Sequence, residues 1–366
     1  MSLGALVHQL IPFEKGCPLP VITAIAHDVP SHDIHAAFAG WAEGQLATRE
    51  RAVFDRMAAR SAIAHRWSVL PKGRSPVDVG GFYDSGRMPP TSARMDLYAR
   101  AAPDLALAAI GKLGPLGNIT HVVVASCTGF TAPGIDQILC ERLGLRGSTE
   151  RLMIGFMGCY AGVTALKAAR TIVRSEPSAR VLVVAVELST LHLQSTTELE
   201  PLLAMLQFAD GAAAALVEAA GAGFELDRPF AATLPETRDL IRWGIGDTGF
   251  AMHLSGEVPR RIGDALADAA TATRLTGGID IAQIDGWAVH AGGRSILDAV
   301  ERGLGLPSEA LAASRTVLHD FGNMSSATLL FALGRLWDAR PNHGVALAFG
   351  PGLAAEGLTF GWTDAD

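Results

Sequence analysis

The stretch GCYAGVTALKAARTIV, residues 158–173, has a counterpart later in the chain, GNMSSATLLFALGRL, residues 322–336. In both copies a glycine and a polar residue precede a run of small and aliphatic residues, a pattern typical of a buried helix. Aligning the copies places Cys159 opposite Asn323. It also brings the apolar stretches that follow, ARVLVVAVE and HGVALAFGP, into register without a gap. The chain is therefore predicted to contain one helix–strand unit twice.

A second pair of segments repeats in the same order. ITHVVVASCTGFTAPGIDQILCERLGL, residues 119–145, matches IDGWAVHAGGRSILDAVERGLGL, residues 284–306. Each reads as a buried strand, a turn of small residues and a helix that ends in Glu-Arg before a Gly-Leu stop. Two pairs with similar separation favour an internal duplication, with an N-terminal half at 1–220 and a C-terminal half at 221–366. Because no Pro/Ser-rich linker separates the halves, we expect them to pack as one unit.

The coarse pattern alternates helical and extended segments, which indicates an α/β fold. Buried strands are predicted at residues 119–126, 179–187, 286–292 and 344–350. Helices are predicted at residues 47–63 and 92–113.

Composition excludes several classes of protein. Hydrophobic residues make up 49% and charged residues 18% of the 366 residues, so a sizeable core is expected rather than disorder. The net charge of −7 disfavours a nucleic-acid binder. No apolar stretch approaches the roughly 18 residues of a membrane helix, and MSLGALVHQL at the start lacks the basic region of a signal peptide. We therefore expect a soluble cytoplasmic protein.

The spacing of the cysteines also favours a cytoplasmic protein. They lack C-x-x-C spacing, so we expect reduced thiols rather than a zinc site or a disulfide framework. They are Cys17, Cys127, Cys140 and Cys159.

Three polar residues occupy corresponding places in the repeats. Cys159 and Asn323 stand at predicted helix starts, and His290 ends a predicted strand. Each has an ordinary reading on its own, as a small core residue, a helix cap and a buried core histidine. Functional groups in open α/β sheets gather beyond the carboxyl ends of strands, however, and the repeat brings these segments together.

Together the three residues suggest acyl transfer through a thioester. A helix N-terminus and a nearby imidazolium would both lower the pKa of Cys159 and favour a thiolate. The Asn323 amide would donate a hydrogen bond to a developing oxyanion.

Four ordered motifs carry a resemblance that covers nearly the whole chain. They are GFMGCYAG at 155–162, VHAGGRSILD at 289–298, GNMSSA at 322–327 and FGPG at 349–352. At these residues the sequence resembles the type III polyketide synthases, the chalcone synthase-like family of the thiolase superfamily. The resemblance implies a thiolase-like duplicated βαβαβαβα fold in five layers, and a homodimer.

The resemblance also implies a mechanism. Cys159 would receive an acyl starter from coenzyme A (CoA), and the enolate left by decarboxylation of malonyl-CoA would attack that thioester. His290 and Asn323 would hold the malonyl thioester oxygen, and His290 would also keep Cys159 ionised. CoA thioesters are the implied substrates, with no metal and no redox cofactor.

Two arginines match family positions that hold the phosphates of CoA. Arg56 and Arg60 are four residues apart, which places both on one helix face. Where the family has a third basic residue this chain has Val53, for which Arg49 or Arg51 would compensate.

The resemblance extends to the substrate pocket. Phe208 matches a gatekeeper phenylalanine whose apolar wall would favour loss of carboxylate as CO2. The positions that depart from the plant chalcone synthase pattern are Cys127, Ala132, Ser189, His192, Trp243 and Met252. The stretch WGIGDTGFAMHLS is closer to bacterial members that make alkylpyrones or alkylresorcinols. We therefore expect an aliphatic, fatty-acyl starter.

Two alternatives remain open. A ketoacyl synthase III-like enzyme uses the same Cys-His-Asn set for a single condensation, and a non-catalytic acyl-CoA-binding homologue would keep the fold without turnover. A serine nucleophile at 325 or 326 is rejected because no G-x-S-x-G elbow is present. Asp210 and Glu187 are interpreted as structural carboxylates, with Glu187 near the cavity.

Overall fold

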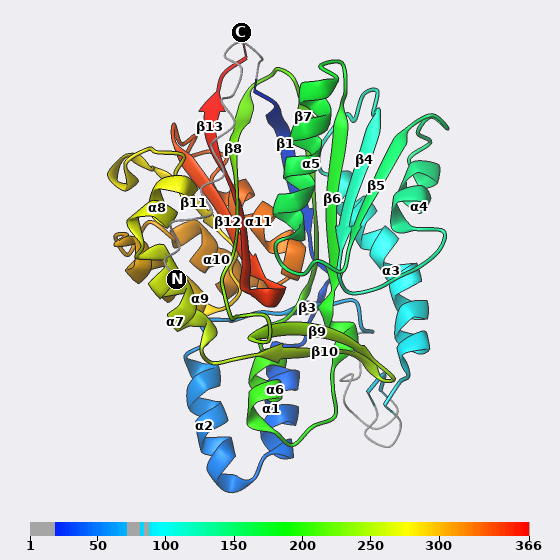
Figure 1. The fold of residues 1–366 in the computed structure, drawn as a ribbon. Coiled ribbons are helices and arrows are strands. Elements are labelled where there is room, and N and C mark those ends of the chain that lie inside the picture. The colour runs from blue at the N-terminus through cyan, green and yellow to red at the C-terminus, as the bar shows by residue number, and fades with distance from the viewer. Residues whose placement is uncertain (1–18, 72–80, 84–87, 366) are drawn as a thin grey trace.

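The computed structural model describes residues 19–71, 81–83 and 88–365, so Cys17 and the N-terminal stretch lie outside it. Nine strands form one continuous sheet in the order β11-β12-β13-β8-β1-β7-β6-β4-β5 (Figure 1). The chain passes from the first half to the second between β7 and β8. Because β1 pairs with both β7 and β8, the two halves share this sheet.

The strands of the sheet are β1 (Val21–Asp28), β4 (His121–Ser126), β5 (Glu150–Gly155), β6 (Val181–Leu188), β7 (Asp210–Glu218), β8 (Gly223–Thr233), β11 (Gly286–Val289), β12 (Gly344–Gly350) and β13 (Ala354–Thr363). Two smaller pairs are β2 (His32–Asp33) with β3 (Trp67–Ser68) and β9 (Ile241–Gly246) with β10 (Gly249–Leu254). The α-helices are α1 (His35–Gln45), α2 (Thr48–Ala59), α3 (Thr91–Ile110), α4 (Ile135–Arg142), α5 (Ala161–Ser175), α6 (Leu199–Met205), α7 (Val258–Leu266), α8 (Ala269–Leu275), α9 (Arg294–Leu304), α10 (Ala312–Phe321) and α11 (Thr328–Arg335). Short 3-10 helices are η2 (Ser189–His192), η3 (Ile281–Gln283), η4 (Ser325–Ala327) and η5 (Pro351–Leu353).

The strands bury side chains on both faces, and alternate residues enter different cores. In β4, Val123 and Ala125 belong to a central cluster, whereas Val122 and Val124 belong to an outer one. β12 divides in the same way between the central cluster and a third cluster. This alternation follows because successive side chains in a strand point to opposite faces of the sheet. Each half of the sheet therefore lies between two layers of helices.

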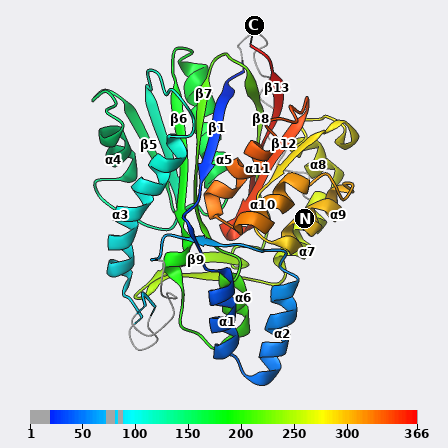
Figure 2. The ribbon, with the colours of Figure 1, turned by 180° about the vertical axis from the view of Figure 1, so that it is seen from behind.

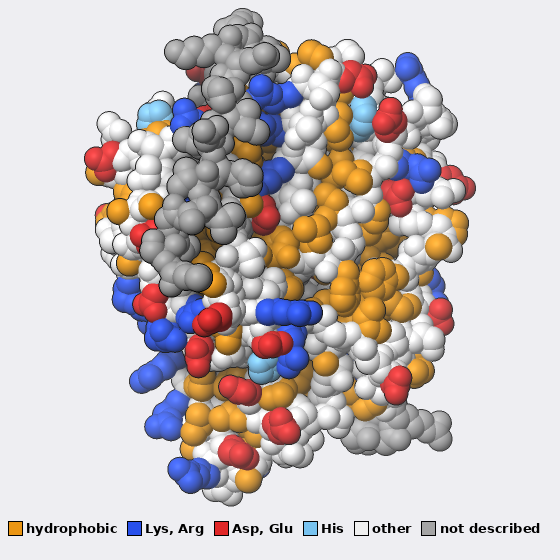
Figure 3. Space-filling model, in the orientation of Figure 1, with side chains coloured by type: hydrophobic (Ala, Val, Ile, Leu, Met, Phe, Trp, Pro, Cys, Tyr) orange, Lys and Arg blue, Asp and Glu red, His pale blue; other side chains and the backbone are white. Residues whose placement is uncertain are grey.

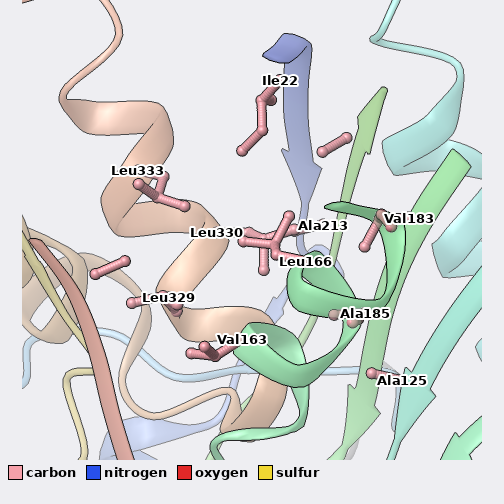
Figure 4. Packing of buried hydrophobic residues seen from close by; sticks show 14 of the residues in the cluster. Ile22, Ala125, Val163, Leu166, Val183, Ala185, Ala213, Leu329, Leu330 and Leu333 are labelled. Atoms are coloured by element: carbon pink, nitrogen blue, oxygen red, sulfur yellow. The ribbon is translucent and has the colours of Figure 1, made fainter. Parts of the chain in front are cut away.

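Helices α5 and α11 form the central layer between the two halves of the sheet. Val163 and Leu166 of α5 face Leu329 and Leu330 of α11 in Figure 4. The outer face of the N-terminal half of the sheet is covered by α3 (Figure 2), and that of the C-terminal half by α7 and α9. The order helix, sheet, helix, sheet, helix is the five-layer thiolase-like arrangement, as predicted.

The predicted repeats are present as elements. α5 and β6 correspond to α11 and β12, and β4 and α4 correspond to β11 and α9. The helix predicted at 47–63 ends earlier, at Ala59, and that predicted at 92–113 ends at Ile110, next to Gly111. Strand β7 begins two residues after Phe208. Its sequence DGAAAALVE favours a helix by propensity, but burial on both faces within the sheet decides for a strand.

The repeated units meet at a close contact. A Cβ atom on Gly162 of α5 would lie 2.2 Å from the carbonyl oxygen of Ser326 in η4. Only glycine permits this approach, which brings the residue before α5 close to the residues before α11. Cys159 and Asn323 are thereby held at one end of the central layer.

At that end, the β9–β10 hairpin and helices α1, α2 and α6 lie below the sheet in Figure 1. Among the described helices, none combines the length and the apolar character needed to cross a bilayer. Within the same part of the chain, no group of three His, Cys, Asp or Glu side chains is placed to hold a metal ion.

Candidate active site

Cys159 lies in the turn between β5 and α5, two residues before the helix begins. Gly158 has φ +83° and Phe156 has φ +56°, so the turn uses left-handed backbone on the N-terminal side of the cysteine. Cys159 is 8% exposed, and side chains of Ser325 and Asn323 are hydrogen-bonded to its thiol. Burial raises the pKa of Cys159 to about 12 in spite of these hydrogen bonds. The lowered pKa expected at a helix start is therefore not found, because desolvation outweighs the helix end.

Asn323 precedes η4 and links the cysteine to the histidine loop. Its Oδ1 accepts a hydrogen bond from the backbone N–H of Ser325 at 2.8 Å, and its Nδ2 donates to the Gly292 carbonyl at 3.3 Å. The Gly292 N–H in turn donates to the His290 carbonyl at 2.9 Å. These bonds fix the orientation of the amide, whose interaction with Cys159 favours the thiolate.

His290 directly follows β11 and is 2% exposed. Neither of its ring nitrogens has a hydrogen-bond partner among the described residues. Burial lowers the pKa of His290 to about 3, so the imidazole is neutral at physiological pH. Both shifts therefore favour a thiol and a neutral imidazole over the predicted thiolate–imidazolium pair.

A small cavity of about 30 Å³ opens onto the thiol. Its lining comes from both halves of the chain. The residues around it are Cys127, Thr128, Gly158, Cys159, Ser189, Phe208, Ile241, Trp243, Met252, Ser325 and Pro351. Five of the predicted pocket residues are thus gathered around Cys159.

A second cavity of about 70 Å³ adjoins the first and extends between α1, α6 and the β9–β10 hairpin. The two cavities share four residues, namely Ser189, Phe208, Trp243 and Met252. Further out the walls are largely apolar and include Phe38, Leu70 and Phe250. The shared residues therefore form the partition between a reaction cavity and a larger apolar one.

The partition is held by backbone pairing and hydrogen bonds. Trp243 and Met252 are cross-strand partners in the hairpin, and the Trp243 indole N–H donates to the Cys127 carbonyl at 2.9 Å. The Ser189 hydroxyl is buried and has no hydrogen-bond partner among the described residues. Among the four shared residues, Ser189 therefore has the polar group that is available for a further hydrogen bond.

Two other predicted pocket residues lie elsewhere. His192 lines the larger cavity, and its ring stacks on Phe250 with centroids 4.1 Å apart. Both of its nitrogens are bonded, to the Thr128 carbonyl and to the Phe250 N–H, and burial lowers its pKa to about 3. Ala132 is exposed and lies outside the lining of both cavities within this chain.

The two buried carboxylates are structural, as predicted. Glu187 accepts hydrogen bonds from the Cys127 N–H and from the hydroxyls of Thr128 and Ser326. Asp210 accepts from the backbone of Val69 and from the backbone and hydroxyl of Thr190. Burial raises the pKa of both groups, that of Asp210 to about 7.

The two predicted phosphate-binding arginines differ in their placement. Arg60, directly after α2, lines a groove of about 600 Å³ at the surface. Arg56 is exposed, does not line that groove, and donates from Nε to the Ala52 carbonyl at 3.2 Å. Arg51, considered as a substitute for the missing basic residue, donates to the carbonyls of Glu43 and Leu46.

Sequence reasoning missed the contribution of Ser325 to the site. This residue lines the reaction cavity, is hydrogen-bonded to Cys159 and has φ +48°. A non-glycine residue in left-handed conformation beside a reactive side chain is typical of functional sites. The sequence places Ser325 within the GNMSSA motif but does not reveal this role, because the signal is a backbone angle and a spatial neighbour.

Comparisons with known proteins agree with this arrangement. The family descriptions "Chalcone and stilbene synthases, N-terminal domain" and "Chalcone and stilbene synthases, C-terminal domain" match residues 21–221 and 225–361. The chain is 34% identical over 284 residues to an "Alpha-pyrone synthesis polyketide synthase-like Pks18" of Mycobacterium tuberculosis, covering 73% of this chain and 72% of that protein. It is 36% identical over 301 residues to a bisdemethoxycurcumin synthase of Oryza sativa subsp. japonica, covering 74% and 73%.

The fold has a similar counterpart in the crystal structure of PKS-I from the brown alga Ectocarpus siliculosus, with a TM-score of 0.86 and 29% identity over 96% of this chain and 100% of that one. The same family is therefore indicated by both family descriptions, by two relatives above 30% identity and by a solved structure of the same fold. The chain belongs to the chalcone and stilbene synthase family and is a type III polyketide synthase, an acyl-transferring condensing enzyme.

Proposed function

We propose that this enzyme extends an aliphatic acyl-CoA starter with several malonyl-CoA units through a thioester on Cys159, and that it releases pyrone- or resorcinol-type products. The observation that carries the proposal is the buried cavity at the thiol, which is bounded by Phe208 and adjoins a larger apolar cavity. Cys159, His290 and Asn323 are the proposed catalytic residues.

In the loading step, the sulfur of Cys159 attacks the thioester carbonyl of the starter. The neutral imidazole of His290 accepts the thiol proton and returns it to the sulfur of CoA, which leaves as the free thiol. The hydrogen bonds that Ser325 and Asn323 make to Cys159 support this step, because they favour the thiolate over the thiol.

In the condensation step, the carboxylate of malonyl-CoA leaves as CO2, and the electron pair of the broken bond moves onto the thioester oxygen. The second N–H of Asn323 and the N–H of neutral His290 are proposed to donate to that oxygen. The enolate carbon then attacks the acyl group, and Cys159 leaves as the thiolate. The chain, now two carbons longer and attached to CoA, reloads on Cys159 for the next cycle.

The larger cavity supports an aliphatic starter. Its volume of about 70 Å³ has room for on the order of five water-sized groups. Its largely apolar walls suit a hydrocarbon chain that passes Phe208 and Trp243. The mycobacterial relative's description as an alpha-pyrone synthesis enzyme supports the proposed product class.

Three further expectations belong to the same proposal. CoA thioesters supply the electrophile, the carbanion and the leaving group, so the reaction requires no metal or redox cofactor. The free cysteines at 127, 140 and 159 suit the reducing cytoplasm. The halves 1–220 and 221–366 form one duplicated unit, and two copies of the chain form a homodimer through the exposed apolar edge at β5.

The test is an assay with labelled malonyl-CoA and a series of straight-chain acyl-CoA starters, with products identified by mass spectrometry. We expect one CO2 per added two-carbon unit and cyclised products of at least two extensions. Cys159→Ala is expected to lower product formation by at least about a thousandfold. Cys140→Ala, which removes a free cysteine on α4 remote from the cavities, is the matched control and keeps activity.

The outcomes separate the alternatives. A single β-ketoacyl product would identify a ketoacyl synthase III-like enzyme instead. Folded protein that releases no CO2 with any starter would identify an acyl-CoA-binding homologue without turnover. Products formed only from aromatic starters would overturn the aliphatic assignment while leaving the mechanism in place.

A further inference from the structure

The groove of about 600 Å³ is built from both halves of the chain. The first half contributes Met57 and Arg60 near the end of α2, and Gln207 after α6. The second half contributes Arg294 and Asp298 from the first turns of α9. Two arginines that are far apart in sequence therefore border one surface depression.

Neighbouring residues position Arg294 but engage only some of its N–H donors. Its Nη1 donates to the backbone carbonyl of Arg60 at 3.3 Å, which ties α9 to the end of α2. Its Nε lies 3.6 Å from Asp298, a loose contact, while the same carboxylate accepts a closer bond from Arg315 at 2.8 Å. The Arg294 side chain is 50% exposed. A guanidinium has five N–H donors, so most of them remain available to a ligand in the groove.

The acidic neighbour does not cancel this charge. Asp298 is shared between Arg294 and Arg315, and Arg315 also binds Glu301 at 2.6 Å. Among the residues that line the groove there are two arginines, Arg60 and Arg294, and one carboxylate, Asp298. An anion in the groove is thus attracted by the excess positive charge and meets planar donors suited to phosphate oxygens.

We propose that Arg294 and Arg60 together bind the phosphate groups of the CoA thioester, one from each half of the chain. The inference rests on the proposed function, because that function supplies the CoA thioester. It explains how the site operates with Val53 where a basic residue is expected, since the missing cation is replaced from α9 rather than from α2. It also removes the need for Arg49 or Arg51 as substitutes.

The test compares substrates with and without phosphates. For Arg294→Ala, the KM for an acyl-CoA is expected to rise about tenfold while kcat changes by less than twofold. The KM for the N-acetylcysteamine thioester of the same acyl group, which has no phosphate, is expected to stay within twofold. Arg294→Lys, which keeps the charge but loses the fork of donors, should fall between Arg294→Ala and the wild type. Arg302→Ala removes an exposed arginine from the same helix and is the control for net charge.

Each outcome decides the assignment. An equal loss with both thioesters would overturn it, because Arg294 would then act on the shape of the site and not on phosphate. An unchanged KM for acyl-CoA in Arg294→Ala, or an equal rise in Arg302→Ala, would overturn it as well. Failure of the proposed function is distinguishable, since the wild-type enzyme would then form no product from either thioester. In that case direct binding of CoA, measured by calorimetry, still reports on Arg294.

Discussion

Burial dominates the protonation of the residues at the centre of the site. Cys159 and His290 are both driven towards their neutral forms, with the pKa of Cys159 raised to about 12 and that of His290 lowered to about 3. A stable ion pair would need the two charges to compensate for the solvation that both groups lose. In the free enzyme, burial therefore favours the thiol of Cys159 over the thiolate.

This state predicts slow alkylation of Cys159 at neutral pH. A raised pKa means that the thiolate fraction, and with it the rate of reaction with iodoacetamide, should increase about tenfold per pH unit from pH 7 to pH 9. Ser325→Ala removes a hydrogen bond that favours the thiolate, so it should slow the reaction further. The measurement is residue-resolved alkylation followed by mass spectrometry.

Cys140 serves as the internal control in the same samples, because it is half-buried on α4 and away from Ser325. Its rate should not respond to Ser325→Ala. If Cys159 instead reacts rapidly at pH 6–8 with a rate that does not depend on pH, the free enzyme contains the thiolate–imidazolium pair.

At the residue scale the sequence predicts which side chains meet but not their protonation. Cys159 and Asn323 were found as equivalent positions of a repeat, and the structure joins them by a hydrogen bond. The direction of the Cys159 pKa shift was wrong because a helix start has the same sequence pattern whether it is solvated or buried. Ser325 was missed because its left-handed φ has no counterpart in the residue type.

At the scale of elements, one glycine controls how the two repeats approach each other. Gly162 lies in the first turn of α5, where a Cβ would lie 2.2 Å from the Ser326 carbonyl oxygen and 3.2 Å from Leu330. Because the first of these neighbours is backbone, the contact cannot be relieved by rotating a side chain. The helices of the central layer would have to separate, together with the catalytic residues that precede them.

Gly162→Ala is therefore expected to lower the free energy of unfolding by about 2 kcal/mol or more, in spite of the higher helix propensity of alanine. The measurement is urea unfolding followed by circular dichroism. Gly40→Ala in the interior of α1 is the matched control, since a Cβ there would meet no atom within 4 Å. That control should stabilise the protein by about 0.5–1 kcal/mol. If both variants were stabilised alike, the close contact between α5 and η4 would not constrain the fold.

The sequence predicted best those elements whose apolar run begins and ends at clear boundary residues. β12 was predicted at residues 344–350 and occupies Gly344–Gly350, because a glycine stands at each end of its apolar run. The β9–β10 hairpin was not predicted as an element. Its importance lies in Trp243 and Met252, which face the cavities, and that orientation depends on the packing of the hairpin rather than on its own pattern.

At the scale of the whole molecule, the sheet order leaves β5 at one edge. Successive side chains in a strand point to opposite faces, yet Leu152 and Met153 are 43% and 38% exposed. Phe130, near the carboxyl end of β4, is 46% exposed. Figure 3 shows apolar side chains gathered over the part of this face where β5 lies in Figure 1. An unprotected apolar edge of this kind is a favourable surface for a second copy of the chain.

The homodimer proposed at this edge can be disrupted by a single charge. Met153→Arg would place an unpaired guanidinium against the same edge of the partner, so we expect the dimer to dissociate to monomers at micromolar concentration. Light scattering coupled to size-exclusion chromatography measures the mass directly. The control is Ala270→Arg, which charges an exposed position of α8, on the other side of the molecule from β5 in Figure 1, and should leave the dimer intact. A wild-type chain that is monomeric at these concentrations, or a Met153→Arg variant that stays dimeric, would place the interface elsewhere or remove it. Because the turn that holds Cys159 directly follows β5, a monomeric variant is also expected to show lower condensing activity, whereas Ala270→Arg should retain it.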